Sequence, residues 1–111
     1  MKRKDVQLII QIRDYIEEHL YEPHSIDDLC RKFNINREKL QVGFREQTGT
    51  TVHAYIIKLR MERAAQRLVE SDDSIKVIAL NSGYKKQRSF NKTFKTLFHL
   101  TPAAYRKMHQ K

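Results

Sequence analysis

Residues 25–44 read SIDDLCRKFNINREKLQVGF and predict two short helices joined by a tight turn. Ser25 begins a capping-box pattern, so its side chain is expected to start a helix that ends near Asn34. Asn36 is expected to cap the next helix, which carries Leu40 on its inner face. The turn between them needs a left-handed backbone, which Asn34 tolerates better than most residues. This pattern is typical of a helix-turn-helix unit.

A second copy of the pattern follows later in the chain. An offset of 49 residues relates residues 25, 26, 29, 30 and 34 to Ser74, Ile75, Ile78, Ala79 and Gly83. An offset of 50 residues relates residues 40, 44, 51 and 55 to Phe90, Phe94, Thr101 and Tyr105. The second unit therefore has one extra residue between Gly83 and Phe90. Cys30 and Ala79 are expected to be small core residues where the two helices of each unit pack closely.

The rest of the chain predicts further helices, about seven in all, and an all-α fold. Isoleucines at helical spacing predict an amphipathic helix over about residues 5–20, which Pro23 stops. Thr101 and Pro102 are a suitable cap and first turn for a last short helix. The expected organisation is an N-terminal helix with the first unit (residues 1–50), a linker helix (51–70), and the second unit with a C-terminal helix (71–111).

The linker helix is expected to begin after Thr51 and end at about Glu70, with Tyr55, Leu59 and Leu68 facing inward. At 1.5 Å per residue its length is about 30 Å, close to the roughly 34 Å between successive major-groove segments on one face of DNA. We therefore expect it to place two reading helices on the same face of a duplex. Three arginines on this helix are candidates for phosphate contacts: Arg60, Arg63 and Arg67. Arg60 is equally a candidate for a structural salt bridge.

The composition limits the classes of function and partner that the chain can have. The chain has 22 Lys and Arg against 13 Asp and Glu, a net charge of +9, which favours a polyanionic partner. Its single cysteine excludes an internal disulfide, and its histidines lack metal-ligand spacing. Because it has neither a phosphate-binding loop nor a nucleophile motif, we expect no enzymatic activity, cofactor or metal. Without an apolar run or signal peptide, we expect a cytoplasmic protein with no membrane partner.

Several short motifs resemble the DNA-binding domain of AraC/XylS-type transcription regulators, from about residue 8 to Arg106. They are LRMERA at residues 59–64, Ile78-Ala79, Gly83-Tyr84, the stretch from Phe90 through Phe94 to Thr101-Pro102, and Tyr105-Arg106. The resemblance implies two helix-turn-helix units joined by one long helix, binding promoter DNA as an activator or, less often, a repressor. It also implies RNA polymerase as a partner. We expect this chain to be monomeric in solution.

The chain departs from the family pattern at three positions. His99 stands where the family often has glycine, so we expect a strained or differently shaped turn there. Lys86 occupies a position that is commonly acidic, where it is a candidate helix cap. Val42 replaces a residue that is often basic, so the phosphate or base contact that the resemblance implies at this position is in doubt.

The candidate DNA-contacting residues are those that the buried positions of each second helix turn outward. Gln41, Gln87 and Asn91 suit adenine, Arg88 suits guanine, Glu38 can accept from cytosine, and Val42 can touch a thymine methyl. The cations are expected at phosphates or the helix start: Arg37, Arg45, Lys85, Lys86, Lys92 and Lys95.

Two other classes of function are compatible with these features. A basic helical module could bind RNA or an anionic membrane surface, which competition between duplex DNA, RNA and anionic vesicles would reveal. A helical adaptor could bind another protein, and its binding would survive removal of the basic reading-face residues.

Overall fold

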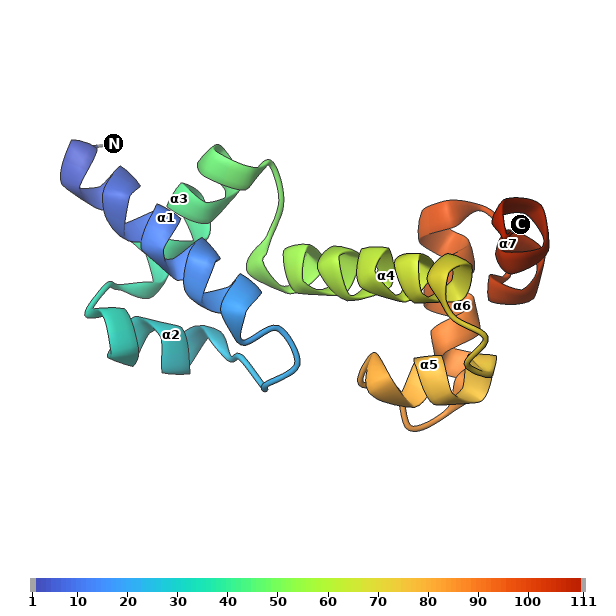
Figure 1. Cartoon of the computed structure of the whole chain (residues 1–111). Helices are drawn as coiled ribbons and strands as arrows, with labels where there is room; N and C mark the ends of the chain where they lie inside the picture. The colour runs from blue at the N-terminus through green and yellow to red at the C-terminus, as the bar shows by residue number, and fades with distance from the viewer. Residues whose placement is uncertain (1, 111) are drawn as a thin grey trace. The chain divides into compact units, whose positions relative to one another are not determined.

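The computed structural model describes residues 2–110, which form seven α-helices and no strand (Figure 1). The helices are α1 (Arg3–Glu18), α2 (Ile26–Phe33), α3 (Arg37–Thr48), α4 (Val52–Glu70), α5 (Ile75–Asn81), α6 (Gln87–Phe98) and α7 (Pro102–His109). The predicted all-α fold is confirmed. Contacts divide the chain into two compact units, Met1–Ile57 and Lys58–Lys111, and α4 contributes residues to both.

The first unit is built around α1, which packs against α2 and α3. The predicted periodicity of α1 is confirmed, because Ile9, Ile12 and Ile16 are fully buried. The helix begins and ends two residues earlier than predicted. His19 leaves the helical conformation at φ −120°, yet Leu20 remains buried in the turn that follows.

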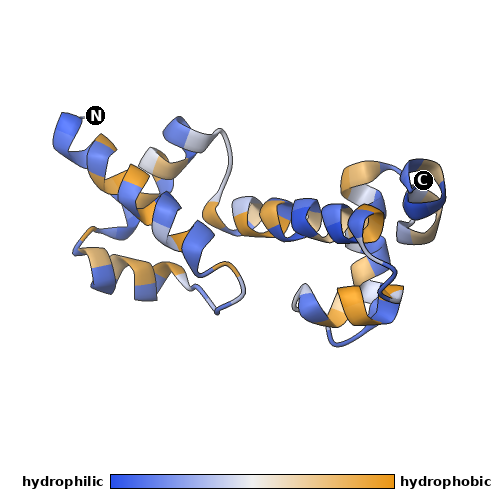
Figure 2. Ribbon diagram, in the orientation of Figure 1, coloured by the Kyte–Doolittle hydropathy of each residue, from blue (hydrophilic) through white to orange (hydrophobic). Residues whose placement is uncertain are grey.

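The second unit packs α6 against α5 and α7. Its core contains Phe90 and Phe94, both fully buried, together with Met61 and Leu68 from α4. Leu97 of α6 is 42% exposed and lies outside this core. Figure 2 shows the amphipathic character of the helices, with hydrophobic and hydrophilic residues on different faces of the same ribbon.

The predicted inner face of α4 is partly wrong. Leu68 is buried, but Tyr55 and Leu59 are only half-buried. The buried positions of α4 are Val52 and Ile56 in the first unit and Met61, Ala64, Ala65 and Leu68 in the second. Because the two halves of α4 belong to different units, one inward stripe does not describe the whole helix.

The side-chain caps of the two units repeat, as the sequence predicts. The hydroxyls of Ser25 and Ser74 accept hydrogen bonds from the backbone amides three residues on, at 3.0 and 3.1 Å. Thr51 and Thr101 do the same for the helices that follow, both at 3.1 Å. These bonds satisfy amides that the first turn of a helix leaves without a partner, so they define where each helix begins.

The turns of the two units are also equivalent. Asn34 is left-handed at φ 51° and Gly83 at φ 94°, which confirms the predicted turns. The amides of Ile35 and Tyr84 close them on the carbonyls of Cys30 and Ala79, at 3.1 and 3.0 Å. Ala79 is buried, whereas Cys30 is only half-buried, so the core position predicted for Cys30 is correct only in part.

The turn at His99 keeps the left-handed shape, with φ 65° and ψ 8°, close to φ 79° and ψ 3° at Gly49. The expectation of a different shape is therefore wrong. Because His99 has a Cβ atom, its left-handed conformation costs conformational free energy that a glycine would avoid. Lys86 precedes α6, but its side chain makes no capping hydrogen bond, because an ammonium group can only donate.

Candidate nucleic-acid interface

The second helix of the first unit, α3, is held by its inner face and leaves its outer face open. Leu40, Gly43 and Phe44 are buried against α1 and α2. The predicted contact residues of this unit are all exposed on α3: Arg37, Glu38, Gln41, Val42 and Arg45. The predicted reading surface of the first unit is therefore accessible.

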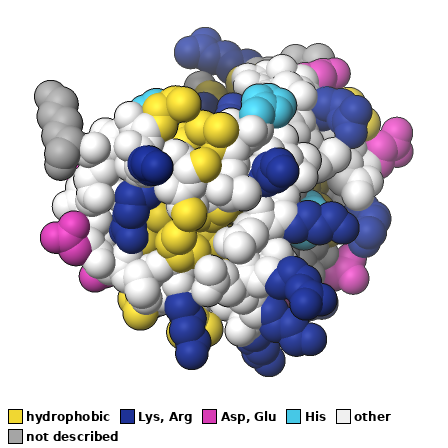
Figure 3. Space-filling model, turned by 90° about the vertical axis from the view of Figure 1, so that its right-hand side faces the viewer, with side chains coloured by type: hydrophobic (Ala, Val, Ile, Leu, Met, Phe, Trp, Pro, Cys, Tyr) yellow, Lys and Arg dark blue, Asp and Glu magenta, His cyan; other side chains and the backbone are white. Residues whose placement is uncertain are grey.

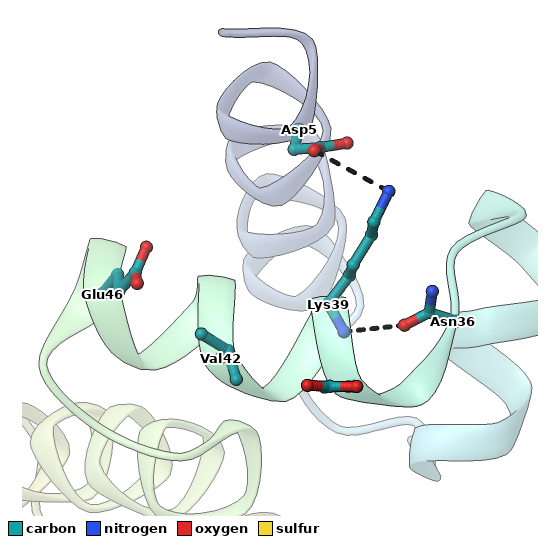
Figure 4. A pocket seen from close by; sticks show the side chains of 6 residues that line it. Asp5, Asn36, Lys39, Val42 and Glu46 are labelled. Atoms are coloured by element: carbon teal, nitrogen blue, oxygen red, sulfur yellow. Dashed lines mark hydrogen bonds and ion pairs between the residues drawn. The ribbon is translucent and has the colours of Figure 1, made fainter. Parts of the chain in front are cut away.

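Ion pairs to neighbouring helices orient the beginning of α3. The guanidinium of Arg37 lies 2.9 Å from a carboxylate oxygen of Asp27 on α2. The ammonium of Lys39 lies 4.0 Å from Asp5 on α1, and the Lys39 amide donates to the Asn36 side chain at 2.8 Å (Figure 4). Because these contacts are exposed, they contribute orientation more than stability.

A pocket beside α3 carries mixed charge. Glu38, Val42 and Glu46 line it on the α3 side, with Asp5 contributed by α1 (Figure 4). Two carboxylates on the outer face of α3 make this unit a weaker phosphate attractor than its arginines alone would suggest.

His53 is a candidate contact that the sequence analysis did not identify. It is exposed in the first turn of α4 and lines a pocket together with Gln41 and Arg45. Position 53 follows the Thr51 cap by two residues, so its place at the start of a helix is the sequence feature that could have identified it. An imidazole there can donate to a phosphate or a base edge.

The second helix of the second unit, α6, presents a more strongly basic face. Phe90 and Phe94 are buried, and no acidic residue occurs in α6. Six of the predicted residues of this unit are exposed: Lys85, Lys86, Gln87, Arg88, Lys92 and Lys95. Lys and Arg side chains are prominent on the molecular face shown in Figure 3.

Asn91 differs from the other predicted contacts because it is half-buried. Its Oδ1 atom is enclosed and has no hydrogen-bond partner among the described residues. A bidentate contact to adenine requires both the oxygen and the amide nitrogen. In this conformation Gln87, which is exposed, is therefore better placed than Asn91 to read adenine.

The arginines of α4 have structural partners. Arg67 pairs with Asp73, beyond the end of α4, which competes with its predicted phosphate contact. Arg60 lies close to the turn of the second unit, where a Cβ added to Gly83 would be 3.3 Å from its Nη1. Residues 2–110 contain no cluster of His, Cys, Asp and Glu that could hold a metal ion. No helix described here is long and apolar enough to cross a membrane.

Comparison with known proteins identifies the family. A family model described as a helix-turn-helix domain matches residues 29–108. The multiple antibiotic resistance protein MarA of Escherichia coli is 31% identical over 105 residues, covering 95% of this chain and 83% of MarA.

Two solved structures have the same fold. The C-terminal domain of AraT, a response regulator from Geobacillus stearothermophilus, superposes with a TM-score of 0.85 at 25% identity, covering 94% of this chain and 87% of that one. The DNA-binding domain of the global transcriptional factor AdpA, solved in complex with a target DNA, has a TM-score of 0.81 at 25% identity, with 90% of each chain covered. With its repeated helix-turn-helix units and its similarity to MarA, the chain belongs to the AraC/XylS-type family of transcription regulators.

Proposed function

We propose that this chain binds double-stranded promoter DNA sequence-specifically and regulates transcription, with α3 and α6 each entering a major-groove segment. The observation that carries the proposal is the repeated unit: two second helices are each held by a buried inner face and expose a polar outer face. Major-groove edges are read by side chains on helices of this kind. The related AdpA domain, solved in complex with a target DNA, supports the proposal that this chain binds DNA.

The contacts are assigned by chemistry. Arg88 is suited to guanine and Gln41 and Gln87 to adenine, because each can form two parallel hydrogen bonds with its base. The cations Arg37, Arg45, Lys85, Lys86, Lys92 and Lys95 are assigned to phosphates or to the groove edge, where they supply affinity that depends on salt. The proposed functional parts are residues 1–50, the linker helix 51–70, and residues 71–111.

A single chain is proposed to occupy an asymmetric site, because its two reading helices differ in sequence. Selection of bound sites from random duplex DNA, followed by footprinting, tests this directly. We expect one chain per site and protection over roughly two helical turns. A strictly palindromic site that requires two copies of this chain would contradict the proposal.

Transcription activation through contact with RNA polymerase in the cytoplasm is the proposed outcome, in keeping with the bacterial regulators to which the chain is similar. In vitro transcription from a template that carries the selected site should rise when the chain is added. A template with a scrambled site is the control. Repression of the same template would show regulation of the opposite sign, while equal output from both templates would exclude site-specific regulation.

A further inference from the structure

A groove on the second unit is separate from the proposed DNA-reading face. It has a volume of about 400 Å³ and lies between the C-terminal half of α4 and the adjoining α6 and α7. Ala65, Val69, Phe98 and Tyr105 supply its apolar surface. The rings of Phe98 and Tyr105 lie 5.4 Å apart between centroids, so this surface is partly aromatic.

The position of α7 against α4 is fixed by hydrogen bonds, so the groove is a built feature. The Arg106 guanidinium donates from Nε to the Leu68 carbonyl at 3.0 Å and from Nη2 to the Ser71 carbonyl at 3.2 Å. The side-chain amide of Gln110 donates to the same Ser71 carbonyl at 2.9 Å. These bonds hold the aromatic wall beside the end of α4.

The rim of the groove is acidic in an otherwise basic chain. Glu62, Gln66 and Glu70 are exposed at four-residue intervals, which places them on one face of α4. Gln66 donates to Glu70 at 3.3 Å. Within residues 2–110 neither carboxylate forms an ion pair. At 1.5 Å per residue, the two glutamates are about 12 Å apart along the helix axis.

The chemistry of the groove selects its occupant. Two carboxylates repel phosphates, so nucleic acid is not a suitable ligand. A small molecule would find its polar partners only on the exposed rim, whereas small-molecule sites enclose theirs. We propose that the groove docks a helical segment of a partner protein that carries two Lys or Arg side chains two turns apart, with an apolar side chain between them.

The groove remains available when α6 reads DNA. Phe98 continues the buried stripe of Phe90 and Phe94, at four-residue spacing, so it lies on the packing side of α6. The proposed reading residues Arg88 and Lys92 lie on the outer face of the same helix. The second unit can therefore bind its partner segment and DNA at the same time.

The test uses a defined probe: a 15-residue alanine-based helical peptide with Lys at positions 4 and 11 and Leu at positions 7 and 8. It is titrated into the isotope-labelled full chain without DNA and followed by chemical-shift changes. We expect saturable shifts at residues 62–70, 98 and 105. The double variant Glu62→Gln/Glu70→Gln should weaken binding about five-fold, the effect of losing two exposed ion pairs.

The matched control is Asp14→Asn/Glu18→Gln, which removes two exposed carboxylates from α1 in the first unit, outside the reading helices, and should bind the peptide like the parent chain. A third variant, Gln66→Trp, should fill the groove and block binding without removing a charge. All substituted side chains are exposed, and thermal melts verify folding. Equal peptide affinity in all variants, shifts spread over both units, or no binding would overturn the proposal.

Duplex affinity, measured on the same variants, keeps this test separate from the test of DNA binding. The two double variants have equal net charge, so we expect them to bind a duplex equally well. If DNA binding fails in every protein while the peptide still binds, only the proposed function is wrong. If the peptide fails while the duplex binds, only the docking surface is wrong.

Discussion

The phenol of Tyr55 donates a hydrogen bond to Oε1 of Glu17, which joins the first turns of α4 to the end of α1 within the first unit. The ring of Tyr55 also packs edge-on against Phe44 of α3, with centroids 5.3 Å apart. Tyr55 thus connects α1, the reading helix α3 and α4. Burial, together with the hydrogen bond and charge of Glu17, raises the pKa of Tyr55 to about 12 from its ordinary value of 10.

This pKa predicts loss of stability at high pH. The neutral phenol is favoured in the folded state, so its contribution is complete below pH 10 and lost between pH 10 and about pH 12. Tyr55→Phe removes the hydrogen bond and should destabilise the first unit by about 1–2 kcal/mol at neutral pH. Urea denaturation from pH 8 to pH 12 measures both effects. The difference between the two proteins should shrink over that range, and a constant difference would contradict the prediction.

The left-handed turn at Asn34 predicts opposite effects for two substitutions. Asn34→Val should destabilise the first unit by about 1–2 kcal/mol, because a β-branched side chain resists this conformation. Asn34→Gly should be neutral or mildly stabilising, since glycine adopts φ 51° without steric cost. Urea denaturation monitored by circular dichroism compares them. Equal stability of the two variants would show that Asn34 is not left-handed in solution.

Arg106 is predicted to stabilise the second unit through its hydrogen bonds. Its two hydrogen bonds satisfy carbonyls at the end of α4 and beyond it, at Leu68 and Ser71. Arg106→Ala should destabilise the second unit by about 1–3 kcal/mol, because those groups lose a charged donor. Lys107→Ala, the neighbouring exposed cation, is the control and should change stability little. Similar melting temperatures for the two variants would rule out this role.

Lys92 and Lys95 are predicted to supply affinity without sequence preference. Replacing either by Ala should weaken binding to cognate and scrambled duplexes alike and lower the salt slope by about one for each phosphate that is no longer neutralised. Titrations at several salt concentrations measure the slope. A variant that binds the cognate duplex more weakly but the scrambled duplex unchanged would show that its lysine reads a base.

Glu38 is predicted to supply sequence preference without adding affinity for DNA. An exposed carboxylate on α3 repels phosphates, so its place on a reading face is understandable if it accepts a hydrogen bond from cytosine or restrains a neighbouring arginine. Glu38→Ala should relax base preference at one position while leaving or raising non-specific affinity. Selection from random duplexes, with Glu38→Gln as a comparison, tests this. Equal weakening on cognate and scrambled duplexes would remove the proposed division between a discriminating first unit and a more electrostatic second unit.

The features that depend on local chemistry were predictable from the residues alone. Caps at Ser25, Asn36 and Thr101 follow from short polar side chains before an apolar period, and each makes its predicted hydrogen bond. The repeat and the buried stripe of α6 follow from helical spacing, which also exposes Arg88 and Lys92. These properties need only a few neighbouring residues, so a linear pattern contains them.

The environment that side chains share, by contrast, depends on how the helices pack. The inner face of α4 could not be predicted as one stripe, because its two halves pack into different units. The enclosed Oδ1 of Asn91, the pairing of Arg67 with Asp73, and the groove between Glu62 and Tyr105 depend on how separate elements meet. Side-chain periodicity specifies the direction from one helix axis, whereas burial and pairing depend on what the neighbouring helix places there.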